Sequence, residues 1–196
     1  MSEPYVIAPL GKVKGENAYP GFEEMLKDLQ DAAIARAEKI WSGWKFGGIL
    51  PGDKEFGIAP LRAREMANDV SATTLSGTYS YRKNLGSTGW YTLFDYSVRD
   101  DILHAFAGFK VTDDVLRLLQ FRMEIYDKKL PIIDVQAAKG WGEFAILFKV
   151  DEGKELIAEP RHSVYVRGYV EATGYQTIVP LGFQLYKTKN LVISES

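Results

Sequence analysis

The chain contains no cysteine, and this absence excludes three kinds of chemistry. A disulfide-stapled scaffold, a thiol nucleophile and a thiolate metal site all require that residue. Histidine is almost as scarce, with only His104 and His162 among 196 residues. Neither belongs to a His-Glu-x-x-His motif or a His-x-His pair, so the sequence predicts neither a transition-metal site nor a cofactor. We interpret both histidines as hydrogen-bonded structural residues.

An excess of one charge is also missing. The 24 basic and 26 acidic residues are mixed along the chain, which has a formal net charge of -2. Nucleic-acid binding and attachment to an anionic membrane usually need a basic stripe, so we expect neither partner. Residues 79–83 do interleave tyrosine with arginine and lysine, as in single-strand nucleic-acid surfaces. One such segment in a net acidic chain gives little support to that function.

Long apolar runs are absent as well. The longest is far shorter than the roughly 20 residues that a membrane-spanning helix needs. The first residues, Met1 to Pro4, lack the basic and then apolar pattern of a signal peptide. We therefore expect a soluble protein of the cytoplasm or of a virion assembly. Neither a Gly-x-Ser-x-Gly elbow nor a phosphate-binding Walker loop occurs, so the sequence does not predict an enzyme.

The first 20 residues are predicted to form an extended arm, because prolines and glycines punctuate them. Their apolar stretch from Tyr5 to Leu10 needs a surface to dock on, either its own domain or a neighbouring subunit. Residues 21–42 are predicted to be a helix, because apolar residues recur every three or four positions.

The rest of the N-terminal third carries weaker signals. Residues 45–60 are rich in glycine and proline and are predicted to be a long ordered loop. Residues 61–69 follow Pro60 and are predicted to be a short helix. Residues 21–70 as a whole are expected to pack on a β-domain formed by residues 71–196, within one structural domain.

From residue 73 the apolar period changes to two, which is typical of half-buried strands. We predict about eight strands: 76–82, 90–99, 102–111, 115–126, 131–137, 143–150, 163–172 and 175–187. Turn residues separate them and no helical pattern intervenes, so the predicted fold class is mainly β with an N-terminal helix. The β-domain is predicted to be an antiparallel, jelly-roll-like sandwich. Pro180 indicates an edge strand or a bulge.

The order of arm, helix and eight strands resembles virion structural proteins of the single-jelly-roll or capsid-decoration kind. Residues 164–169 and 178–183 also look like segments of such proteins. The resemblance covers roughly residues 73–187 and concerns the architecture only. It implies a self-assembling capsid, decoration or turret protein. The expected partners are other copies of the chain and, as an alternative, another structural protein. The basic genome-binding arm of such capsid proteins is missing, which favours a decoration, turret or shell-stabilising role.

Eight residues are candidates for an interface or a ligand platform: Tyr5, Val6, Ile7, Leu10, Tyr79, Tyr81, Trp90 and Trp141. The first four form the apolar stretch of the arm, and the other four are aromatic residues near glycine-rich turns. A protein interface explains them, and so does a carbohydrate-binding or adhesion module whose rings stack on a glycan. A metal-free jelly-roll enzyme is a third alternative, which needs a concave pocket with two acids or a perturbed histidine.

Overall fold

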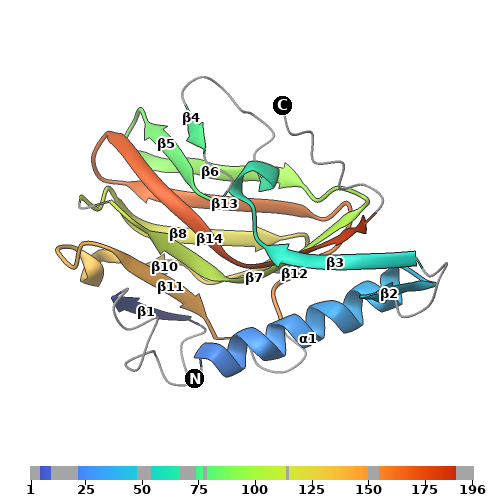
Figure 1. The fold of residues 1–196 in the computed structure, drawn as a ribbon. Coiled ribbons are helices and arrows are strands. Elements are labelled where there is room, and N and C mark those ends of the chain that lie inside the picture. Colours follow the sequence, from blue (N-terminus) through green and yellow to red (C-terminus); the bar gives the residue numbers. More distant parts are fainter. Residues whose placement is uncertain are drawn as a thin grey trace.

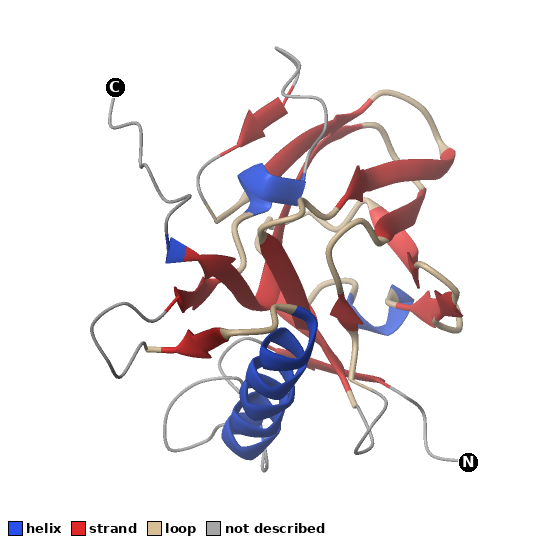
Figure 2. Ribbon diagram, turned by 90° about the vertical axis from the view of Figure 1, so that its right-hand side faces the viewer, coloured by secondary structure: helices blue, strands red, loops and turns tan. Residues whose placement is uncertain are grey.

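The computed structural model describes residues 5–9, 22–47, 54–66, 74–76, 79–113, 115–149 and 155–188. Two sheets face each other, and one long helix lies against the larger sheet (Figure 1, Figure 2). This arrangement confirms the predicted fold class, mainly β with an N-terminal helix and a jelly-roll-like β-sandwich. Within the described ranges, no helix has the length and apolar character needed to cross a bilayer.

Helix α1 (Phe22–Ile40) confirms the helix predicted over 21–42 and ends two residues earlier. Acidic side chains lie in its first turn and a lysine in its last, which suits the helix dipole. Its buried stripe includes Leu29, Ala33 and Ala37, and this stripe packs on Leu103 and Leu185 of the larger sheet. Two alanines at the contact let the helix backbone approach the sheet closely.

The larger sheet has nine strands. They are β1 (Tyr5–Pro9), β2 (Trp44–Phe46), β3 (Lys54–Pro60), β4 (Thr74–Ser76), β5 (Tyr81–Leu85), β7 (Ile102–Val111), β11 (Phe144–Phe148), β12 (Ile157–Ala158) and β14 (Gly174–Lys187). The main path is β1-β11-β7-β14-β3-β2. β12 pairs with β7. β5 pairs with β14 along one edge and with β4 along the other. β2 runs parallel to β3, and the other pairs are antiparallel.

The smaller sheet has five strands in the order β10-β8-β13-β6, with β9 paired to β8. They are β6 (Gly89–Ser97), β8 (Leu118–Ile125), β9 (Lys128–Lys129), β10 (Ile133–Asp134) and β13 (Ser163–Val170). Two short 3-10 helices complete the described elements, η2 (Ala63–Met66) and η3 (Gln136–Ala138). η2 lies inside the short helix predicted over 61–69.

The first 60 residues contribute more strand than the sequence predicts. Residues 5–9 form regular strand β1, which pairs with β11 in the same chain, whereas we expected an arm without regular structure. The predicted loop 45–60 is also wrong over most of its described part, because β2 and β3 pair there. The larger sheet therefore draws three strands from before residue 71. Short strands rich in glycine and proline carry too little alternation to be seen in the sequence.

Three strand predictions need correction. The run predicted over 76–82 is divided between β4 and β5, and the run predicted over 131–137 keeps only the two strand residues of β10 before η3 begins at Gln136. β14 is not an edge strand, because β7 pairs along one of its edges and β5 and β3 along the other. The predicted bulge is present as a register shift between Leu181 and Gly182. Pro180 lies in the short stretch that neither β5 nor β3 pairs, where a missing N–H costs little.

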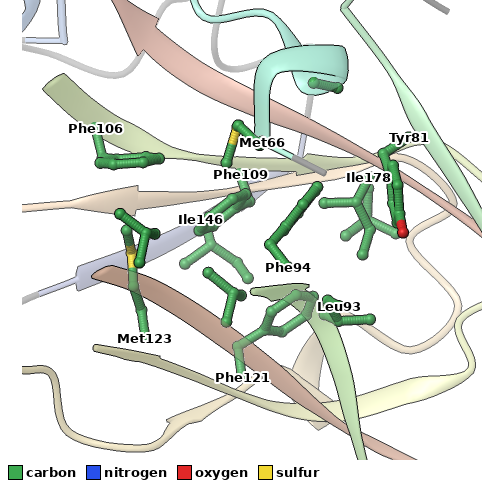
Figure 3. Packing of buried hydrophobic residues seen from close by; sticks show 14 of the residues in the cluster. Met66, Tyr81, Leu93, Phe94, Phe106, Phe109, Phe121, Met123, Ile146 and Ile178 are labelled. Carbon is green, nitrogen blue, oxygen red and sulfur yellow. The ribbon is translucent and has the colours of Figure 1, made fainter. Parts of the chain in front are cut away.

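The main core lies between the two sheets, and aromatic rings meet near its middle (Figure 3). Phe109 of the larger sheet lies at its centre, with ring centroids 6.2 Å from Phe94 and 6.4 Å from Phe121 of the smaller sheet. Phe148 meets the same ring edge-on at 5.9 Å. All four side chains are at most 2% exposed. Each such burial contributes about 2 to 3 kcal/mol, so this cluster holds the sheets face to face.

Gly182 occupies the bulge of β14 in a conformation that other residues rarely adopt, with φ +136°. A Cβ atom there would lie 2.0 Å from the carbonyl oxygen of Ala105, which is backbone in β7 and has no freedom to move aside. We predict that Gly182→Ala lowers the free energy of unfolding by about 3 kcal/mol or more in urea titrations.

Gly86→Ala is the matched control. Gly86 follows β5, and no atom lies within 4 Å of an added Cβ atom. We expect that substitution to change the free energy of unfolding by less than about 0.5 kcal/mol. Equal stability of the two variants would contradict the role assigned to the bulge.

Candidate functional site

The outer face of the smaller sheet carries aromatic and charged side chains in place of the small polar residues usual on a solvated sheet. In β13, Val164, Val166 and Val170 point into the core and are completely buried. Tyr165 and Tyr169 alternate with them and point outward, and Tyr169 is 39% exposed. This alternation follows from the strand period of two.

The strand register aligns the outward residues of β8, β13 and β6 in four rows, which together we name the outer sheet face. The first row is Gln120, Tyr169 and Trp90; the second is Arg122, Arg167 and Thr92. The third row is Glu124, Tyr165 and Asp95; the fourth is Ser163 and Ser97. Large rings, cations, anions and small hydroxyls therefore follow one another along the strands.

Arg167 lies at the centre of the outer sheet face. Its guanidinium carbon is 5.7 Å from the ring centroid of Trp90 and 5.8 Å from that of Tyr165. Trp90 and Tyr169 meet edge to face, at 5.7 Å with an interplanar angle of 81°. The Tyr165 hydroxyl hydrogen-bonds the Thr92 hydroxyl at 3.2 Å. These contacts hold the rings and the arginine in one arrangement.

The charges on this face are only partly neutralised. Glu124 pairs with Arg122 at 2.9 Å and with Lys129 at 3.6 Å. Arg167 lies directly opposite Arg122 on the neighbouring strand, a like-charge pair that is unfavourable by itself. Among the described residues, Arg167 forms no ion pair, and its buried Nε has no hydrogen-bond partner. The Arg167 guanidinium is therefore held against two aromatic rings and has no carboxylate partner among the described residues.

Four of the predicted candidates lie together in a different place. Tyr5, Val6 and Ile7 of β1 line a groove of about 850 Å³, together with the exposed ring of Trp141. Asp134 of β10 also lines it, so the groove runs between edge strands of the two sheets. Leu10, the remaining candidate of the arm, lies outside the described residues.

The other three candidates differ in their exposure. Tyr81 is only 2% exposed, and its ring packs 4.8 Å from Phe94 in the core, so the expectation that it meets a ligand or partner is wrong. Tyr79 is exposed in a bend just before β5. Trp90 belongs to the first row of the outer sheet face. Burial removes Tyr81 from any glycan-binding surface, and a glycan site at Tyr79, Trp90 or Trp141 stays a prediction.

Four residues of the outer sheet face were not predicted from the sequence: Arg122, Tyr165, Arg167 and Tyr169. The signal lay in residues 163–170, where valine or glycine alternates with serine, tyrosine and arginine. That period predicts a strand, and it also shows that the polar face carries two tyrosines around one arginine. Only the pairing with β6 and β8 brings Trp90 and Arg122 beside them.

The two histidines have separate structural roles. His104 is 1% exposed between the sheets, and its Nδ1 is 2.8 Å from the Tyr96 hydroxyl, across from the larger sheet to the smaller one. His162 stacks on Tyr126 at 4.6 Å, and its Nδ1 accepts a hydrogen bond from the Glu159 N–H at 3.2 Å. Both are hydrogen-bonded, as predicted from the sequence.

A second groove, of about 680 Å³, lies beside α1. Phe106, Phe148 and Leu29 contribute to its lining, and so do four acids, Glu24, Asp28, Asp31 and Glu155. Neither histidine lines this groove, but its acids meet the two-acid condition of the enzyme alternative, which therefore stays a prediction. Among the residues that the structure describes, no group of three acids or histidines is arranged to hold a metal ion.

Comparisons with known proteins add no identity to this geometry. No protein-family model matches the chain, and a search of curated proteins finds no match.

His104 is predicted to make the fold sensitive to acid. Burial lowers the pKa of His104 from 6.5 to about 3, whereas the unfolded chain takes up the proton near 6.5. Its contribution to stability is therefore complete above about pH 6.5. It is lost as the pH falls, by roughly 1 kcal/mol per pH unit down to about pH 3.

The measurement is the free energy of unfolding in urea at several pH values between about 4 and 7. His104→Asn keeps a polar atom near Nδ1 but does not titrate, so we expect a shallower dependence on pH. His162→Asn is the control and should retain the slope that His104 contributes. Parallel curves for the wild-type chain and His104→Asn would show that the buried imidazole is not the sensitive group.

Proposed function

We propose that the protein is a self-assembling structural protein and that the outer sheet face is one of its contact surfaces. The observation that carries the proposal is the cluster of Trp90, Tyr169, Tyr165 and Arg167 on an open sheet. Tryptophan, tyrosine and arginine are the residue types that supply most binding energy at protein interfaces. Polar and charged side chains adjoin the cluster in the neighbouring rows, as a polar rim adjoins an interface core.

The same geometry makes a glycan platform the weaker alternative. A sugar ring or a base stacks on an accessible, flat aromatic face. Here the guanidinium of Arg167 lies over both Trp90 and Tyr165. Tyr169 stands almost perpendicular to Trp90, so the two rings offer no common plane. A protein partner needs no such plane, because its side chains pack around the edges of the rings.

The finer form of the proposal is a shell or decoration protein of a virus-like particle. Its support is the architecture alone: an N-terminal strand and helix precede a jelly-roll-like sandwich. In such an assembly the helix side and the open side of one subunit have different roles. The helix completes the core of its own chain, and the outer sheet face is left for another chain.

The test is the solution mass at several protein concentrations, by light scattering or sedimentation. We expect the wild-type chain to associate above its 22.0 kDa monomer mass. The double variant Trp90→Thr with Tyr169→Thr should raise the dissociation constant at least about thirtyfold, because each ring counts as a binding hot spot. Threonine is chosen because it is a good strand former.

Tyr175→Thr is the matched control. Tyr175 is a similarly exposed tyrosine at 43%, but it lies on β14 of the larger sheet. Its loss should leave the association unchanged. A wild-type chain that stays at 22.0 kDa at the highest concentration would overturn the proposed function. Glycan binding abolished by Trp90→Thr in a monomeric protein would favour the carbohydrate-binding alternative.

A further inference from the structure

The row pattern of the outer sheet face is complementary to itself. The cationic second row lies directly beside the anionic third row, and the bulky first row and the small fourth row lie outside them. A surface with this order matches an identical surface whose rows run the opposite way. We infer that the outer sheet face binds the same face of a second copy of the chain, and that a two-fold axis relates the two copies. This inference rests on the proposed function.

The axis that fits lies between the two faces and runs across the strands, between the second and third rows. It places the second row of each copy over the third row of the other. Arg122 then faces Glu124 of the second copy, and the reciprocal contact forms as well. Two-fold interfaces always repeat each contact in this way. The strands of the two copies cross at a small angle, as in aligned sheet packing.

This arrangement supplies what Arg167 lacks. Arg167 faces Tyr165 of the second copy, and in the same row Glu124 and Asp95 lie on the strands beside that tyrosine. The guanidinium, which forms no ion pair within the described part of its own chain, therefore lies between two carboxylates of the other copy. Bidentate pairing of guanidinium with carboxylate is the strongest charge contact available to a protein surface.

Side-chain size is matched by the same axis. The first row lies over the fourth, so Trp90 covers Ser97 of the second copy and Tyr169 covers Ser163. Both serines are exposed in the isolated chain and leave room for a ring. A two-fold axis along the strands is excluded by charge, because it would place Glu124 over Asp95 of the second copy and Arg122 over an uncharged threonine.

The experiment is charge-reversal complementation with the full chain. Arg122→Glu alone places a new carboxylate against Glu124 of the second copy, and Glu124→Arg alone places two arginines together. We expect each single variant to associate at least about tenfold more weakly than the wild-type chain. An equimolar mixture of the two should restore the dissociation constant to within about threefold of wild type, because the opposite charges meet again.

The double variant Arg122→Glu with Glu124→Arg extends the test to a single chain. It exchanges the two charges, so it should self-associate more tightly than either single variant. A misfolded variant does not regain association on mixing, and therefore recovery in both arms reports the contact itself. The matched control is Lys110→Glu, which reverses a cation that pairs with Glu143 but belongs to β7 of the larger sheet, away from the outer sheet face. It should leave the association close to that of the wild-type chain.

The outcomes separate the two proposals. If the wild-type chain associates but the mixture and the double variant do not recover, the two-fold arrangement is wrong and self-assembly through another contact stands. If the mixture recovers no better than the single variants while Trp90→Thr with Tyr169→Thr still disrupts association, the face is used with a different axis. A wild-type chain that never associates removes both the arrangement and the proposed function.

Discussion

The structure depends on one strand that is buried on both of its faces. In β7, nine of the ten residues are buried, and its two faces meet different layers. Leu103, Ala105 and Ala107 pack under α1, whereas Phe106 and Phe109 point between the sheets. A strand with no solvent-exposed face needs a packing layer on each face and a hydrogen-bonded strand along each edge. The helix, the second sheet, β11 and β14 supply that cover and those partners.

The smaller sheet is buried on one face only, and its other face is the surface on which the proposed function rests. Its inner residues serve the core, and no described element covers its other face, where Trp90 and Tyr169 remain exposed. Residues there are released from packing constraints, so their identity reflects what the protein meets. Under the proposed function, the larger sheet supplies stability and the outer sheet face supplies contact with another chain.

The sequence predicted the elements whose apolar pattern extends over many residues. It missed the short strands, which form only because they pair with a neighbouring strand. α1 and strands such as β7 and β13 repeat their apolar spacing over eight or more residues. β2 and β3 are short and flanked by glycine and proline, so only the sheet reveals them. The outer sheet face could not be predicted from the sequence for a similar reason. Thr92 and Tyr165 are 73 residues apart, and no single-chain periodicity states which strands become neighbours.

β14 is the last described strand, and it pairs with β7, β3 and β5. During synthesis on a ribosome, β7 therefore emerges long before its most extensive neighbour exists. β1 likewise waits for β11, which lies more than a hundred residues later along the chain. Non-local pairing of this kind slows folding and leaves apolar strands transiently unprotected. Apolar strands such as β7 therefore stay without their main partner until the residues of β14 are available for pairing.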